Sequence, residues 1–248
     1  MIQIRRSAER HHDQRRKREV WRTFDPTARS DRPPDRFGLL EAIDESRLPP
    51  RADVPRRVRG DAEVITYVRE GAVAYDDSTG HAGVIHAGEF QRMLAIHGAR
   101  HSEANASRTE WAHVFQIRIC DSAPELEPAR EQKRFSAAER RGVLCLVASP
   151  DARAGSLRLG QDTQIYSALL EPGQHVVHEL APAHAAWLHV VQGEITLGDF
   201  VLITGDGAGV LIERAVSLTA RAGSEILLFD LAERDVHGPS ISSRESGR

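Results

Sequence analysis

The sequence predicts an all-β protein that contains two tandem β-barrels. Short runs of β-branched and aliphatic residues recur along the chain and are separated by turns rich in Gly, Asp and Ser, which is the pattern of barrels and sandwiches. The runs form two sets on either side of a polar connector, residues 121–142. With 248 residues in all, each set is long enough to bury a core of its own.

The first set follows a Pro- and Arg-rich opening and ends at Cys120. Its strands are expected at residues 63–71, 72–77, 83–90, 91–96 and 111–119. We assign residues 1–120 to this N-terminal barrel. The first 22 residues are a basic run interrupted by acidic side chains, which we interpret as a solvated and partly flexible arm, with a partner-binding segment as the alternative.

The connector, residues 121–142, has two prolines, high charge and few apolar residues, so we interpret it as a linker that could contain one short helix. Strand patterns resume in residues 143–234, the predicted C-terminal barrel. They cover residues 143–149, 156–160, 164–173, 175–180, 185–193, 194–207, 208–212, 215–223 and 224–232. Residues 235–248 are polar and Ser-rich, which predicts a flexible tail.

Internal similarity indicates a duplication. In each half a strand ends in a glycine, Gly71 or Gly193, and is followed by a hairpin and a Gly-rich turn into the next strand. Two barrels explain this more simply than one long sandwich.

Composition predicts a soluble, cytoplasmic protein. Hydrophobic residues make up 40% and charged residues 28%, and no apolar run reaches the roughly 18 residues that a membrane helix needs. Cys120 and Cys145 stand far apart, so we expect reduced structural thiols. The sequence has no P-loop, dinucleotide-binding or serine-hydrolase motif, so those enzyme classes have no support.

The stretch IHGARHSEAN, residues 96–105, carries a chemical signal. His101 and Glu103 are two residues apart, and on a strand such residues project from the same face. An imidazole and a carboxylate could therefore converge on one point inside a barrel. A transition-metal site usually takes three or four protein ligands, so this pair is half of a site.

Together these features resemble the pirin family, whose members consist of two cupin barrels. The segments that carry the resemblance are residues 1–12, 37–50, 63–103, 149–159 and 205–212. They extend over most of the chain, and residues 63–103 match the family pattern without insertion or deletion. The resemblance implies a bicupin fold.

In pirins a metal, usually iron, is held by two histidines of a His-Pro-His motif together with the His-x-Glu pair. The resemblance places His101 and Glu103 at the second pair, and Arg57 and Arg59 at the first. An arginine has no free lone pair to donate to a metal, so the resemblance implies a divergent member with a degenerate metal site. We expect no cofactor, with one iron, nickel or copper ion in the N-terminal barrel as the alternative.

Three interpretations of this site are open. In the favoured one, Arg57 or Arg59 points into the barrel and pairs with Glu103, so that a guanidinium supplies the positive charge. In the second, a nearby side chain completes a metal site, and Glu63 is the best candidate for a third ligand. The other candidates are Asp61, His81 and His97. In the third, the two arginines form a pocket for a small carboxylate or phosphate.

For the histidines of the second half and the large aromatic residues we expect structural roles and not roles in a site. Four histidines of the second half are expected at the surface or in hydrogen bonds, because their spacing does not converge them. They are His175, His178, His184 and His189. The aromatic residues expected in the core are Trp111, Trp187 and Phe229.

The sequence supports two candidate functions. The first is a non-catalytic pirin-like protein that binds a small ligand or a protein partner as a regulator or sensor. Its expected binding residues are Arg57, Arg59, His101 and Glu103. The second is a dioxygenase resembling quercetin 2,3-dioxygenase, with Glu103 as the base that removes a flavonol hydroxyl proton. We expect a monomer with no membrane or nucleic-acid partner.

Overall fold

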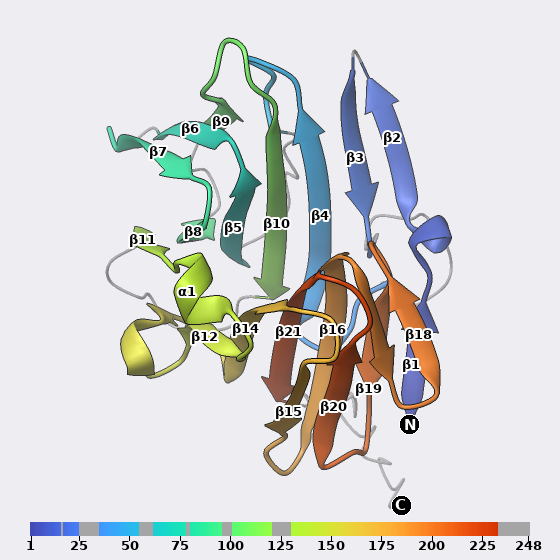
Figure 1. Cartoon of the computed structure of the whole chain (residues 1–248). Coiled ribbons are helices and arrows are strands. Elements are labelled where there is room, and N and C mark those ends of the chain that lie inside the picture. The colour runs from blue at the N-terminus through green and yellow to red at the C-terminus, as the bar shows by residue number, and fades with distance from the viewer. Residues whose placement is uncertain are drawn as a thin grey trace, which may run out of the picture.

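The structure is a computed structural model of the whole chain (Figure 1), and it describes residues 1–15, 17–24, 35–54, 62–77, 80–95, 101–120 and 130–232. For Ala95 and His101 it describes the backbone alone. The predicted strands at residues 63–71 and 224–232 correspond to two of its long strands. The predicted tail, residues 235–248, lies outside the described residues.

The N-terminal barrel contains ten of the described strands. They are β2 (His11–Arg15), β3 (Arg18–Arg22), β4 (Leu40–Leu48), β5 (Ala62–Glu70), β6 (Ala72–Asp77), β7 (Ala82–His86), β8 (Glu89–Ala95), β9 (His101–Asn105), β10 (Ala112–Cys120) and β11 (Arg130–Arg134). Seven of them form a sheet in the order β11-β8-β5-β10-β4-β3-β2, and the other three form a sheet in the order β7-β6-β9.

The C-terminal barrel has the same plan. Its described strands are β1 (Ile2–Arg5), β12 (Cys145–Ser149), β13 (Leu157–Arg158), β14 (Thr163–Leu170), β15 (His175–Glu179), β16 (His184–Gln192), β17 (Glu194–Leu197), β18 (Phe200–Ile203), β19 (Gly207–Val210), β20 (Ala215–Ala220) and β21 (Ser224–Ala232). They form a seven-stranded sheet, β1-β19-β16-β21-β14-β12-β13, and a four-stranded sheet, β15-β20-β17-β18. The all-β, two-barrel prediction is therefore confirmed.

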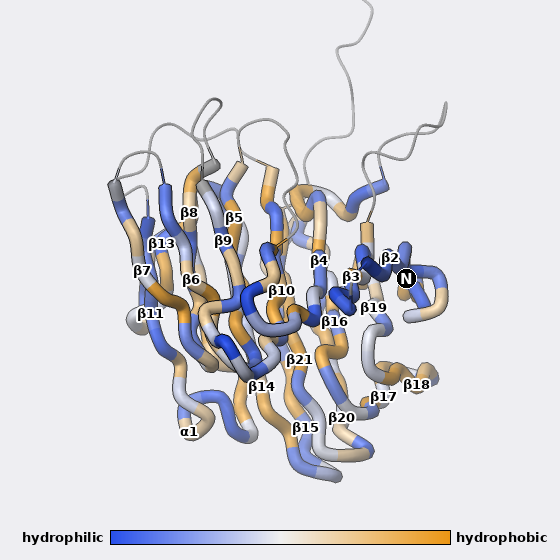
Figure 2. Tube along the Cα trace, turned by 90° about the horizontal axis from the view of Figure 1, so that it is seen from above, coloured by the Kyte–Doolittle hydropathy of each residue, from blue (hydrophilic) through white to orange (hydrophobic). Residues whose placement is uncertain are grey.

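A shared apolar core lies between the barrels. Side chains alternate across a strand, and on β5 Ile65 and Tyr67 join a cluster with Phe229 and Leu231 of β21. Val68 of β5 instead faces the interior of its own barrel. Figure 2 shows the hydrophobic segments of β10 and β21 in the middle of the molecule.

The interior of the N-terminal barrel is less apolar than that of its partner. Among the described residues its cluster has seven buried hydrophobic members, whereas the C-terminal interior has sixteen. Glu103 and other buried polar side chains also belong to this barrel, which makes its interior the place to look for a site.

The two glycines that suggested duplication occupy equivalent corners. Gly71 joins β5 to β6, and Gly193 joins β16 to β17, so at each glycine the chain passes from the large sheet to the small one. Both have positive φ, 76° and 95°. A Cβ at either position would lie 2.5 Å or less from a backbone oxygen. Only glycine fits such a corner without strain.

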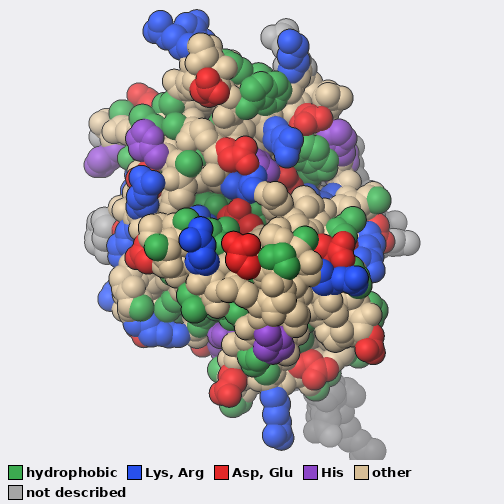
Figure 3. All heavy atoms as spheres, in the orientation of Figure 1, with side chains coloured by type: hydrophobic (Ala, Val, Ile, Leu, Met, Phe, Trp, Pro, Cys, Tyr) green, Lys and Arg blue, Asp and Glu red, His purple; other side chains and the backbone are tan. Residues whose placement is uncertain are grey.

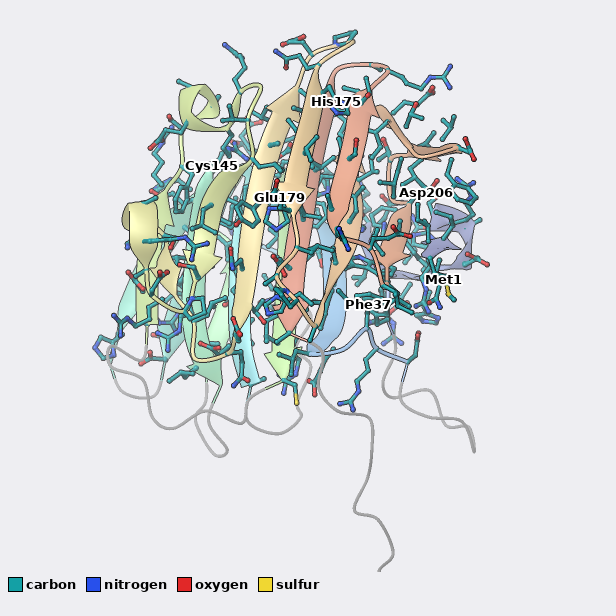
Figure 4. All side chains as sticks on the ribbon, turned by 90° about the horizontal axis from the view of Figure 1, so that it is seen from below. Met1, Phe37, Cys145, His175, Glu179 and Asp206 are labelled. Atoms are coloured by element: carbon teal, nitrogen blue, oxygen red, sulfur yellow. The ribbon has the colours of Figure 1, made fainter. Side chains whose placement is uncertain are left out.

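The basic arm forms paired strands, which corrects the expectation of a partly flexible segment of the N-terminal barrel, although β2 is mostly exposed, as expected of a solvated arm. β1 pairs with β19 of the C-terminal barrel, whereas β2 and β3 extend the N-terminal sheet beside β4. Its arginines form ion pairs within the chain. Arg5 binds Asp35, Arg6 binds Asp206 and Arg10 binds Glu45. The arm thus joins the two barrels, and in Figure 4 Met1 and Asp206 lie on the same side of the molecule.

The predicted linker also differs from expectation. Its one short helix is present as α1 (Ala137–Arg140), capped by Ser136 and Glu139. Two short 3-10 helices, η1 (Ser7–Glu9) and η2 (Arg153–Gly155), lie outside it. However, β11 within the linker pairs with β8 and completes the N-terminal sheet. The linker boundary at residue 121 therefore cuts off a strand of the barrel.

Two further expectations are resolved by burial. Trp187 and Phe229 are buried in the core, but Trp111 is 47% exposed, which corrects its placement there. Cys120 and Cys145 form no disulfide and pack against the shared core, as expected. Of the helices that the structure describes, none is long and apolar enough to cross a membrane. On the face in Figure 3 basic and acidic side chains are interspersed, unlike the single-sign patch typical of nucleic-acid binding.

Candidate functional site

The His101–Glu103 pair lies on β9, a strand of the three-stranded sheet. In the antiparallel register with β6, Glu103 is opposite Tyr75 and His101 is opposite Asp77. Tyr75 packs against the interior cluster of the N-terminal barrel. Directly opposed residues share a face, so Glu103 faces the barrel interior, where it is only 6% exposed.

Gln116 of β10 holds the Glu103 carboxylate from the opposite sheet. Its Nε2 donates to Oε2 of Glu103 at 2.6 Å. On β10 Gln116 is flanked by Thr66 of β5 and Asp44 of β4, which are 2% and 8% exposed. These three polar side chains thus form a row across the inner face of the seven-stranded sheet, opposite Glu103. Nothing in the sequence pattern singled out Gln116.

Glu63 lies on the other face of β5, which corrects its assignment as a third ligand. It is three residues from Thr66, so the two side chains point to opposite sides of the sheet. Its Oε1 accepts from Nε of Arg92 at 3.0 Å, and its Oε2 accepts from the Gly160 amide at 2.9 Å. Glu63 thus ties the N-terminal barrel to the C-terminal domain, and the structure does not bring it to Glu103.

A second group of polar side chains surrounds Asp77, the β6 residue that lies opposite His101. Asp77, opposite His101, has its Oδ2 3.7 Å from Nδ1 of His81 and 3.5 Å from Nη2 of Arg130. The Arg130 guanidinium also lies over the Tyr75 ring, 4.2 Å from its centroid. Because Arg130 belongs to the predicted linker, sequence reasoning missed this cation next to the site.

Several of the predicted site residues lie in parts of the chain that the structure does not describe. Arg57, Arg59, Asp61 and His97 lie outside the described residues, as does the side chain of His101. The pairing of an arginine with Glu103 therefore stays a prediction. Within the described part of the chain, no group of three or more His, Cys, Asp or Glu residues could hold a metal ion.

Three histidines of the C-terminal barrel are hydrogen-bonded, as expected. His178 Nε2 and His184 Nδ1 lie 2.7 Å and 2.6 Å from the two oxygens of buried Asp230. His175 is exposed and lies 2.9 Å from the Thr219 hydroxyl.

His189 departs from that expectation. It is fully buried, and neither ring nitrogen has a hydrogen-bond partner in the described part of the chain. Burial, followed by the nearby charge of Arg10, lowers the pKa of His189 to about 3. His189 lies on the face of β16 that packs between the barrels, with its ring 6.0 Å from that of Phe115. It is a neutral core residue at neutral pH.

The fold and the site define a bicupin whose polar centre lies in the first barrel. The family model described as Pirin matches residues 7–119, and the one described as quercetinase C-terminal cupin domain matches residues 146–231. The chain belongs to the pirin family.

Relatives of this chain cover most of its length. A protein named quercetin 2,3-dioxygenase from Escherichia coli K12 is 37% identical over 93% of this chain and 99% of its own. A pirin-like protein of Caulobacter vibrioides is 30% identical over 79% of this chain and 84% of its own.

Solved structures agree with this assignment. The crystal structure of YhhW from Escherichia coli has a TM-score of 0.86 at 37% identity and covers 96% of this chain and 100% of its own. A complex of bacterial pirin YhhW with nickel(II) has a TM-score of 0.84 at 36% identity, covering 94% of this chain and 100% of its own.

The resemblance to pirins places arginine at two of the four positions expected to hold a metal. Arg57 and Arg59 occupy the positions of the first histidine pair, and a guanidinium stays protonated and cannot donate a lone pair. Glu63, the best substitute ligand, is committed to Arg92 and Gly160 on the other face of β5. Of the four expected positions, His101 and Glu103 keep metal-binding residue types, whereas the other candidates Asp61 and His97 lie outside the described residues.

Proposed function

We propose that this chain is a pirin-family protein that binds a small ligand in its N-terminal barrel without a resident metal ion. It acts through this binding as a regulator or sensor rather than as a dioxygenase. The observation that carries the proposal is the presence of arginine at both positions of the first ligand pair, Arg57 and Arg59.

The retained half of the site supports a binding role. Glu103 keeps its place inside the barrel and is held by Gln116 at 2.6 Å. In the proposal Arg57 or Arg59 offsets the charge of Glu103, because a buried carboxylate is costly unless it is paired. The polar row of Thr66, Gln116 and Asp44 gives a ligand hydrogen-bonding groups on the inner face of the barrel.

A quercetin 2,3-dioxygenase activity is the second candidate. The name of the 37% identical Escherichia coli relative favours it, as does the retention of Glu103, which could accept a proton from a phenolic hydroxyl. Arg57 and Arg59 cannot supply the metal ligands that this chemistry would need.

One experiment separates the two. The protein is purified without chelators, its metal content is measured, and quercetin is added while dissolved oxygen is followed. We expect metal well below one ion per chain and no oxygen uptake, with quercetin bound but not consumed. Near-stoichiometric iron, nickel or copper together with quercetin consumption would establish the dioxygenase instead.

A further inference from the structure

His189 is a fully buried histidine at the interface between the two barrels. On β16 it shares a face with Trp187 of the shared core, and its ring lies 6.0 Å from that of Phe115 on β10. Its register partners on β19 and β21, Gly207 and Leu227, carry no charge. In the described part of the chain neither ring nitrogen has a hydrogen-bond partner. A buried polar group without a partner costs free energy, so packing alone does not account for a histidine here.

Three charged groups on three different elements act on this imidazole. They are Arg10 after η1, Glu45 of β4 and Asp206 before β19, and the charge of Arg10 has the largest effect. Both oxygens of Glu45 are already bound, by Arg10 at 2.7 Å and by His113 at 2.8 Å. A proton on His189 would therefore be an additional buried positive charge beside Arg10.

Residues 6–10, which contain η1, join the two barrels next to this histidine. The Ser7 amide donates to Asp206 of the C-terminal barrel at 2.7 Å, and Arg10 binds Glu45 of the N-terminal barrel. None of the three residues of η1 itself is buried. A segment that is held mainly by polar contacts opens at a lower free energy than a packed core, so residues 6–10 can detach while the barrels remain folded.

We propose that His189 is an acid-sensitive latch, whose protonation releases residues 6–10 from the interface while both barrels stay folded. Opening brings water to the buried imidazole, and the open form then binds a proton that the closed form does not. The latch makes the contact between the arm and the two barrels depend on pH. It is independent of the ligand site proposed in the N-terminal barrel.

The direction of the effect follows from proton binding in the two forms. Burial and the charge of Arg10 lower the pKa of His189 from 6.5 to about 3 in the closed form, whereas an imidazole in water has its ordinary pKa. Below pH 6.5 the open form therefore binds more protons, and the closed form loses stability relative to it as the pH falls. Each pH unit below 6.5 should raise the open fraction about tenfold.

Hydrogen exchange of the full chain, measured by NMR from pH 7 to pH 5, tests the latch. The amides of Ser7, Glu9 and Arg10 are all hydrogen-bonded in the closed form. After correction for the intrinsic exchange rate, their protection should fall about 30-fold between pH 6.5 and pH 5. The amides of the central strands β10 and β21 should keep their protection over the same range.

Two variants remove the proton site. His189→Leu and His189→Gln should make the protection of residues 6–10 independent of pH in this range, because neither side chain titrates there. His175→Leu is the matched control, because His175 is an exposed histidine of the same barrel. This control should retain the change of about 30-fold.

Three results would overturn the latch. If the protection of residues 6–10 does not change between pH 6.5 and pH 5, proton uptake is not linked to their opening. If β10 and β21 lose protection in parallel, the proton acts through global unfolding and not through a local release. If the pH dependence persists in both His189 variants, another group is responsible for it.

Discussion

Arg10 and Glu45 form a buried ion pair between the N-terminal arm and β4, with Nη1 2.7 Å from Oε2 and side chains 3% and 9% exposed. His113 Nε2 lies 2.8 Å from the other Glu45 oxygen. Removing one partner of a buried pair leaves an uncompensated charge. We therefore expect Glu45→Ala to lower the free energy of unfolding by about 3–5 kcal/mol in urea denaturation. Glu213→Ala, which removes an exposed pair with the N-terminus, should cost less than about 1 kcal/mol.

Acid should destabilise the protein through the same carboxylate. Burial alone would raise the pKa of Glu45, but the His113 hydrogen bond and the Arg10 charge lower it from 4.5 to about 2. A carboxyl with a depressed pKa stabilises the fold above its unfolded value, and this contribution is lost as the pH falls through the folded value. We expect a loss of roughly 3 kcal/mol between pH 4.5 and pH 2. Glu45→Gln should lack this loss when unfolding is measured across that range.

His189 should make the stability of the fold depend on pH in a higher range than Glu45 does. Its pKa falls from 6.5 to about 3, so the unfolded chain takes up a proton on acidification before the folded chain does. Stability should therefore decrease from pH 6.5 downward, by about 1.4 kcal/mol per unit until the folded value is reached. His189→Leu should remove this dependence between pH 6.5 and pH 4.5, where Glu45 contributes little. An unchanged slope in that interval would show that His189 is accessible to protons in the folded state.

The barrel corners should not tolerate side chains. Gly193→Ala would place a Cβ 2.4 Å from the Gly223 carbonyl oxygen at a φ of 95°, and we expect a loss of about 2 kcal/mol or more. Gly223→Ala is the matched control, because no other atom lies within 4 Å of its would-be Cβ. Equal stabilities of the two variants in chemical denaturation would refute this account of the corner.

Glu103→Ala tests the proposed arginine partner. If Arg57 or Arg59 pairs with Glu103 inside the barrel, removing the carboxylate should destabilise the fold by about 3 kcal/mol. The loss should be suppressed when Arg57 and Arg59 are both replaced by Met, because no charge is then left unpaired. A change near zero in the native background would mean that Glu103 has no buried cationic partner.

Local patterns in the sequence predicted the fold better than they predicted contacts between distant residues. Gly71 and Gly193 were visible because both end a strand, and the His-x-Glu spacing placed Glu103 on the inner face of β9. The pairing of β1 with β19 joins residues more than 200 positions apart, and no local pattern encodes such a contact.

The missed site residues have the same explanation. Gln116 is an ordinary strand glutamine until the barrel closes and brings it to Glu103. Arg130 lies in a segment whose charge and prolines are typical of a linker, yet the large sheet recruits it as a strand. His189 was expected at the surface or in a hydrogen bond, but β16 is buried on both faces because the barrels pack against each other there.

Nickel binding tests the central claim of a metal-free barrel most directly. Metal-stripped native protein and the Arg57→His/Arg59→His variant are each titrated with Ni²⁺ in a calorimeter. We expect no stoichiometric binding by the native chain and about one ion per chain for the variant, because two imidazoles would join His101 and Glu103 as ligands. Tight binding of one ion by the native chain would contradict the account.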